Sequence, residues 1–161
     1  MGLIVPREAF RALRDSLPPE ARIVFTNGCY DLLHVGHVSL LNYSRALGDA
    51  LVVGVNSDSS VRGLKGPDRP LVPESERAAV IAALPCVDFV IIFDEPTPIE
   101  TIRAVRPAIQ VKGGDYDPEA MPETPVVRDL GGEVVIVPLV PGHSTTGMLE
   151  RIDQRGTNGA S

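Results

Sequence analysis

"RIVFTNGCYDLLHVGHVSLLNYSRALGDALVVGVN" spans residues 22–56 and decides the fold of this chain. The apolar run 22–27 ends in turn residues and indicates a buried strand, and the segment 38–48 has a helical pattern that Gly48 closes. Residues 50–56 are again continuously apolar. Continuous apolar runs, rather than alternating ones, are typical of a parallel sheet that is covered on both faces. This stretch therefore predicts a strand–helix–strand unit of an α/β fold.

The alternation of strands and helices continues along the chain. Further strands are expected at 88–93, 108–114 and 133–139, and further helices at 6–19, 73–84, 98–107, 122–132 and 144–152. A short helix at 57–64 begins at Ser57 or Asp58, and residues 65–73 form a loop. These elements predict a Rossmann-like, doubly wound sandwich with a mainly parallel five-stranded sheet. We expect one domain over 1–161, with a core at about 22–152 and a polar tail at 153–161.

Composition and charge argue against several classes of protein. The net charge of −6 argues against a nucleic-acid binder, and aromatic residues at only 4% imply an aliphatic core. No apolar stretch approaches the roughly 18 residues that span a bilayer, and no secretory signal is visible, so we expect a cytoplasmic protein without a membrane partner. Cys29 and Cys86 lie far apart without a CxxC pattern and are interpreted as reduced thiols.

Polar residues and glycines follow four of the predicted strands. After the first strand come Thr26, Asn27, Gly28, Asp31, His34 and His37; after the second Asn56, Asp58, Lys65 and Arg69; after the fourth Lys112, Gly113 and Asp115; and after the fifth Ser144, Thr145 and Thr146. The carboxyl ends of parallel strands meet at one edge of a sheet, where ligands bind. A set rich in His, Lys, hydroxyls and glycine suits anionic oxygens better than an apolar ligand.

Each of these segments also has a simpler explanation by itself. "TNG" can be only a turn, "STT" only a helix cap, "KGG" only a glycine turn, and Lys65 and Arg69 only solvated loop charges. Their expected position at one edge favours a common site. The sequence has neither GxGxxG nor GxxxxGK[ST], which disfavours a dinucleotide oxidoreductase and a P-loop kinase. A protein-held metal centre from Cys29 and the three histidines is not predicted, because neither CxxC nor HExxH supports it.

The segment "HVGH", residues 34–37, lies where the first strand gives way to a helix. A helix N-terminus offers free N–H groups and positive dipole character, which attract phosphate. His34 and His37 are three residues apart and share one side of the first turn, and Gly36 lets a polyphosphate approach the backbone. The motif predicts donors for phosphoryl oxygens.

Together, "TNGCYDLLHVGH", "VNSD", "LKGPDRP", "ERAAVIAAL", "VKGGDY" and "STTGMLERI" resemble the cytidylyltransferase-like branch of the HxGH nucleotidyltransferases. Within it, they are most similar to the bacterial D-glycero-β-D-manno-heptose 1-phosphate adenylyltransferases. The resemblance implies attack of a sugar 1-phosphate on ATP, with Mg²⁺ usually present, to give ADP-heptose and pyrophosphate. It also implies a homodimer. No kinase domain is visible in this sequence, so we expect a separate sugar kinase to supply the substrate.

The resemblance assigns roles to individual residues. The catalytic residues would be His34, His37 and Lys65. The nucleotide-binding residues would be Thr26, Asn27, Gly28, Cys29, Asp31, Gly36, Lys112, Gly113, Asp115, Ser144, Thr145 and Thr146. The substrate-binding residues would be Asn56, Asp58, Arg69 and Arg77, with Arg77 anchoring the site.

Two alternatives remain at this point. The first keeps the reaction class but uses CTP, with a phospho-alcohol or a phosphonate as acceptor, because the sequence does not resolve the base pocket. The second is a nucleotide-binding regulatory protein without turnover. The intact "HVGH" and "STT" segments and both lysines, Lys65 and Lys112, favour an enzyme over the second alternative.

Overall fold

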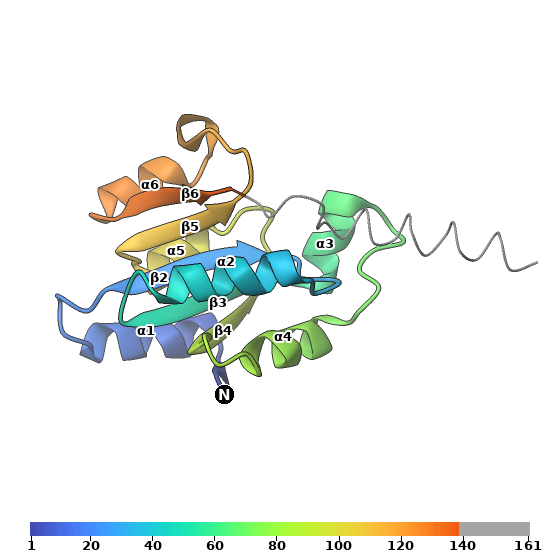
Figure 1. The fold of residues 1–161 in the computed structure, drawn as a ribbon, viewed down its shortest axis with the longest axis horizontal. Helices are drawn as coiled ribbons and strands as arrows, with labels where there is room; N and C mark the ends of the chain where they lie inside the picture. The colour runs from blue at the N-terminus through green and yellow to red at the C-terminus, as the bar shows by residue number, and fades with distance from the viewer. Residues whose placement is uncertain (139–161) are drawn as a thin grey trace, which may run out of the picture.

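The computed structural model describes residues 1–138, and their strands form one six-stranded sheet. The strands are β1 (Leu3–Ile4), β2 (Ile23–Gly28), β3 (Ala50–Asn56), β4 (Phe89–Phe93), β5 (Ile109–Gly113) and β6 (Glu133–Val137). Their order is β1-β4-β3-β2-β5-β6, and every neighbouring pair is parallel (Figure 1). The predicted parallel α/β sandwich is confirmed, with six strands instead of five. The additional strand, β1, has only two residues, both exposed, and such a segment leaves no apolar run to recognise.

The helices lie close to the predicted positions. They are α1 (Arg7–Ser16), α2 (Val35–Arg45), α3 (Asp58–Lys65), α4 (Glu74–Ala82), α5 (Ile99–Val105) and α6 (Thr124–Asp129), with a 3₁₀ turn η1 at Pro118–Ala120. The difference that affects the site is at α2, which begins at Val35 rather than at residue 38, so that "HVGH" forms the N-cap and first turn of the helix. The predicted helix 144–152 and tail 153–161 lie outside the described residues.

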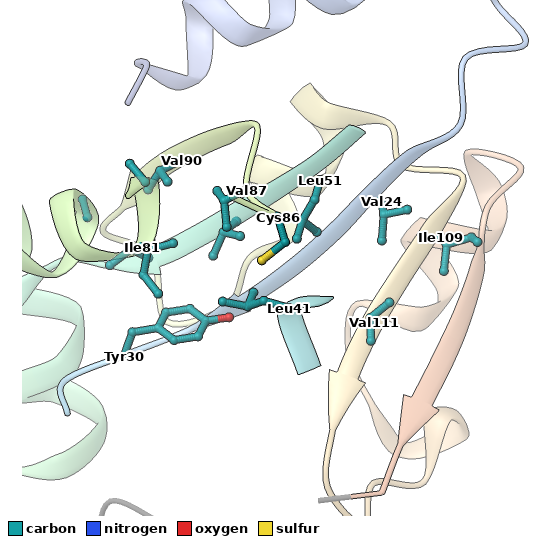
Figure 2. Packing of buried hydrophobic residues seen from close by; sticks show 14 residues of the cluster. Val24, Tyr30, Leu41, Leu51, Ile81, Cys86, Val87, Val90, Ile109 and Val111 are labelled. Carbon is teal, nitrogen blue, oxygen red and sulfur yellow. The ribbon is translucent and has the colours of Figure 1, made fainter. Parts of the chain in front are cut away.

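The helices cover both faces of the sheet. Leu41 of α2 and Ile81 of α4 belong to the buried cluster on one face, as Figure 2 shows. The cluster on the opposite face contains Phe10 of α1, Ile102 of α5 and Val127 of α6. The strands β2, β3 and β4 contribute alternate side chains to the two clusters because successive side chains of a strand point to opposite faces. Burial on both faces explains the continuous apolar runs of the central strands.

The connections create a switch point between β2 and β5. From β2 the chain passes through α2 to β3 on one side, and from β4 it crosses to β5 on the other side of β2. In the register of this pair, Thr26 lies opposite Val111, so the two strands end beside each other. In open α/β sheets, the crevice outside the carboxyl ends of two such strands is the usual ligand position. Within residues 1–138, no helix is both long and apolar enough to cross a membrane.

Candidate active site

The two histidines of "HVGH" lie against each other at the N-terminus of α2. Their ring centroids are 3.8 Å apart and the ring planes differ by 25°. The backbone N–H of His34 donates to Nδ1 of His37 at 3.3 Å, and the backbone N–H of His37 donates to the carbonyl oxygen of His34 at 2.9 Å. Gly36, between them, is buried. The expectation that both imidazoles share one side of the first turn is confirmed.

The environment of His37 keeps its imidazole uncharged at neutral pH. Burial, and then the nearby His34 and Lys65, lower the pKa of His37 to about 4. Because Nδ1 accepts the hydrogen bond from the His34 backbone, the proton of the neutral ring is assigned to Nε2. His37 therefore offers an N–H donor without carrying a charge. Lys65, whose charge contributes to this lowering, is exposed at the end of α3.

Tyr30 packs against His37 from the loop that follows β2. The two rings meet edge to face, with centroids 5.3 Å apart and planes at 63°. Tyr30 is buried at a φ of 50°, in the left-handed region that non-glycine residues rarely adopt. A Cβ on Gly28 would lie 3.2 Å from the Tyr30 ring, so Gly28 leaves room for this packing. Burial also raises the pKa of the Tyr30 phenol, which stays neutral. Tyr30 was not among the predicted site residues; its only sequence signal is an aromatic residue directly after "TNGC".

Asp31 holds the loop that precedes α4. Its buried carboxylate accepts hydrogen bonds from the backbone N–H groups of Leu71 and Val72, at 2.8 and 2.9 Å. It also accepts from Nε of Arg69 at 2.7 Å, and Nη2 of the same guanidinium lies 2.6 Å away. The structure thus brings together two predicted site residues, Asp31 and Arg69, as an ion pair. This pair fixes residues 69–72 against the loop after β2.

Arg77 is buried behind the loops of the site and joins them. From α4, Nη1 donates to the carbonyl oxygens of Cys29 at 2.6 Å and Asn56 at 2.7 Å. Nε donates to the carbonyl oxygen of Val72 at 2.8 Å, and Nη2 donates to the carboxylate of Asp58 at 2.7 Å. With its side chain fully buried, Arg77 directs these donors to protein groups. These contacts support the predicted anchoring role.

The other residues predicted to lie at the end of β3 also form hydrogen bonds within the protein. Asn56 is buried, and its Nδ2 donates to Oγ of Ser60 at 3.0 Å. The backbone N–H of Asp58 donates to the carboxylate of Glu74 at 2.7 Å. Direct contact of Asn56, Asp58, Arg69 or Arg77 with a substrate stays a prediction.

The carboxyl end of β5 presents Lys112 beside the end of β2. The Lys112 ammonium lies 3.3 Å from a carboxylate oxygen of Glu123, a buried residue that was not among the predicted site residues. Gly113 ends the strand, Gly114 follows at a φ of 134°, and Asp115 is exposed. Since Glu123 lies 11 residues after Lys112 on another element, no local pattern indicates this pair.

The structure therefore collects most of the predicted residues around one edge. At the end of β2, Thr26 is buried while Asn27, Gly28 and Cys29 are partly exposed. Ser144, Thr145 and Thr146 lie outside the described residues. Within residues 1–138, no group of three or more His, Cys, Asp or Glu side chains could hold a metal ion. The chemistry available at this edge is donation to anionic oxygens, from a helix N-terminus, imidazole N–H groups and ammonium groups.

The chain is similar in sequence to known proteins. The chain is 55% identical over 152 residues to the Bifunctional protein HldE of Syntrophotalea carbinolica, covering 92% of this chain and 31% of that protein. It is 58% identical over 131 residues to the protein of the same name from Geotalea uraniireducens, covering 81% of this chain and 27% of that protein. The chain thus spans less than a third of the length of these curated relatives.

Solved structures support the same fold. A crystal structure of the lipopolysaccharide core biosynthesis protein from Thermoplasma volcanium has a TM-score of 0.61 and 33% identity, covering 74% of this chain and 97% of that one. A pantoate-β-alanine ligase from Francisella tularensis has a TM-score of 0.59 at 14% identity, covering 86% of this chain and 67% of that one, which shows the fold alone.

The model of the cytidylyltransferase-like family matches residues 25–149, a range that includes most of β2, the "HVGH" turn and β5. This match confirms the sequence-based prediction that the chain resembles the cytidylyltransferase-like family of nucleotidyltransferases. The chain belongs to the cytidylyltransferase-like family.

Proposed function

We propose that this chain is an adenylyltransferase that joins ATP to D-glycero-β-D-manno-heptose 1-phosphate and releases ADP-heptose and pyrophosphate. The observation that carries the proposal is the stacked pair of His34 and His37 at the N-terminus of α2, beside the loop after β2. The names of its relatives, Bifunctional protein HldE and lipopolysaccharide core biosynthesis protein, support a sugar phosphate as acceptor. The sequence resemblance to heptose 1-phosphate adenylyltransferases supports the same choice.

In the proposed reaction, an oxygen of the sugar phosphate forms a bond to the α-phosphorus of ATP. The bond from that phosphorus to the bridging oxygen of pyrophosphate breaks, and pyrophosphate leaves with the electron pair. A phosphate monoester is already ionised at neutral pH, since its second pKa is about 6, and it needs no strong general base. Catalysis of this kind consists of positioning and of stabilising charge.

The residues of the site supply donors for that charge. The neutral His37 would donate from Nε2–H to a phosphoryl oxygen, and the backbone N–H groups at the start of α2 would add positive dipole character. The Lys65 ammonium would partly neutralise the negative charge of the triphosphate. Mg²⁺ usually binds such substrates through the phosphate oxygens and few protein ligands. When bound, the ion would neutralise phosphate charge.

The partners are also proposals. A homodimer is expected from the family resemblance. The proposed acceptor is a sugar 1-phosphate, so the reaction that precedes this one must phosphorylate the sugar, and we propose that a sugar kinase carries it out.

A second candidate is a cytidylyltransferase that uses CTP and a phospho-alcohol or phosphonate. The description of the matching family favours it, because that family is cytidylyltransferase-like. The two candidates share all residues discussed above and differ in the base and in the acceptor that the site takes.

Pyrophosphate release distinguishes these functions. The purified protein is incubated with Mg²⁺, with ATP or CTP, and with heptose 1-phosphate, glycerol 3-phosphate or a phosphonate. The proposal expects turnover with ATP and heptose 1-phosphate and little with the other pairs. Turnover with CTP alone would establish the second candidate instead. Nucleotide binding without pyrophosphate release from any pair would indicate a regulatory protein.

A further inference from the structure

We propose that Glu123 is a positioning residue of the nucleotide site, which holds the Lys112 ammonium at the carboxyl end of β5 where a bound nucleotide would meet it. The inference rests on the proposed function, because Lys112 is a nucleotide-binding residue only in that proposal. Glu123 would not touch the nucleotide. It would act through Lys112.

The geometry of the pair supports this role. One carboxylate oxygen of Glu123 lies 3.3 Å from Nζ of Lys112, and the Tyr116 ring centroid lies 6.0 Å from the same Nζ. The side chain of Glu123 is 6% exposed and that of Lys112 is 17% exposed. Lys112 is therefore partly open to solvent while its partner is almost completely buried. An ammonium group has three N–H donors, so the ion pair leaves donors for an incoming anion.

The local structure shows that the carboxylate of Glu123 pairs with Lys112 instead of capping the helix that follows it. Glu123 directly precedes α6, where the positive dipole character of the helix N-terminus favours a negatively charged side chain. Its side chain makes no such capping bond. Only its backbone oxygen participates in the helix, accepting from the N–H of Val127 at 3.0 Å. The carboxylate thus contributes to the Lys112 pair rather than to the cap of its own helix.

The flexibility of a lysine side chain explains why Lys112 needs such a partner. A long lysine side chain has several rotatable bonds, and a free one would sample many positions and lose that freedom on binding. A buried carboxylate of opposite charge restricts the ammonium to one region before the ligand arrives. Since β5 ends beside β2, that region lies next to the loop predicted to hold nucleotide phosphates. Pre-positioning of this kind improves binding of the nucleotide rather than the chemical step.

The test compares Glu123→Gln and Glu123→Asp with a matched control, Glu119→Gln. Glu119 pairs with Arg128 on the exposed surface between η1 and α6, so its variant removes a carboxylate of the same segment away from Lys112. We expect Glu123→Gln to raise the KM and the Kd for ATP about tenfold, as loss of one ion-pair contact does, with kcat changed little. Glu123→Asp should restore part of that affinity, and Glu119→Gln should behave as the parent. Kd is measured by calorimetry, so binding is followed without turnover.

A double-variant cycle separates positioning from a general structural role. Lys112→Met should weaken ATP binding as Glu123→Gln does, and adding Glu123→Gln to it should weaken binding no further. An unchanged Kd for ATP in Glu123→Gln would overturn the inference, as would a further loss in the Lys112→Met background or a lower melting temperature with unaltered binding. If the parent binds ATP but releases no pyrophosphate with any acceptor, the proposed reaction fails while the binding cycle still decides the role of Glu123. If the parent binds no nucleotide, both fail.

Discussion

The imidazole of His37 lies stacked on that of His34, with ring centroids 3.8 Å apart, and Nδ1 of His37 accepts the backbone N–H of His34. This arrangement fixes the orientation of the His37 ring from two directions, since Tyr30 packs against it edge to face. It also assigns the ring proton to Nε2. Two measurable consequences concern catalysis and the pH dependence of stability.

We expect His37→Ala to lower kcat about 100- to 1000-fold, because one aligned donor to a developing oxyanion contributes that much. The measurement is pyrophosphate release with ATP and the sugar phosphate, together with circular dichroism to show that the fold is retained. Asn42→Ala, on the exposed side of the same helix, is the matched control and should retain activity. Parent-like turnover of His37→Ala would remove His37 from the catalytic machinery.

The lowered pKa of His37 predicts a loss of stability in acid. The folded-state pKa of about 4 lies below the unfolded value of 6.5, so the unfolded state binds more protons between these two values. The contribution of His37 to the free energy of unfolding should therefore be complete above about pH 6.5 and should decrease as the pH drops toward 4. The full shift corresponds to about 3 kcal/mol, and screening of the partly exposed ring reduces the expected loss to about 1–2 kcal/mol.

Urea unfolding of the parent and of His37→Gln at pH 7 and pH 5 tests this titration. Glutamine keeps an acceptor near the His34 N–H but does not titrate. The difference in unfolding free energy between the two pH values should be smaller in His37→Gln than in the parent. The same difference in both proteins would show that His37 does not cause the acid sensitivity.

We expect Arg77→Ala to destabilise the protein by about 3–5 kcal/mol, because it leaves the Asp58 carboxylate and three carbonyl oxygens without their buried donor. Arg77→Lys should also destabilise it, since one ammonium group cannot reproduce the geometry of the guanidinium. Urea unfolding measures both effects. Arg103→Ala is the control: its pair with Glu100 is exposed, and its removal should change stability little. An Arg77→Ala protein as stable as this control would contradict the anchoring role.

Asp31 should hold residues 69–72 in a fixed conformation. In Asp31→Ala, the N–H groups of Leu71 and Val72 lose their acceptor and Arg69 loses its ion pair, so hydrogen exchange of these two amides should become much faster. Asp31→Asn keeps a side-chain oxygen for the amides and should show a smaller increase. Asp68→Ala, an exposed acidic residue of the same loop, should leave the exchange rates unchanged. Equal protection of Leu71 and Val72 in Asp31→Ala and the parent would show that Asp31 does not hold this loop in place.

The elements of the fold were predictable because they depend on local patterns. Apolar runs such as 50–56 identify buried strands, and Ser57 at the start of α3 accepts the N–H of Ser60, as its cap position predicts. The parallel order followed from the alternation of strands and helices. The edge strand β1 was missed because two exposed residues carry no periodicity. The start of α2 was placed three residues late because "HVGH" has no apolar pattern that distinguishes a loop from a first turn.

The sequence by itself determined the parallel α/β fold, the edge at which polar residues gather, and the i, i+3 placement of His34 and His37. These depend on spacing and turn chemistry over a few residues. Only the tertiary structure decided that Arg77 joins Cys29 and Asn56, residues 48 and 21 positions before it, and that Glu123 faces Lys112. It also decided that His37 is neutral, because its pKa depends on burial and on charges brought close by the fold. Ion pairs and desolvation between distant segments arise from chain packing, which no local pattern encodes.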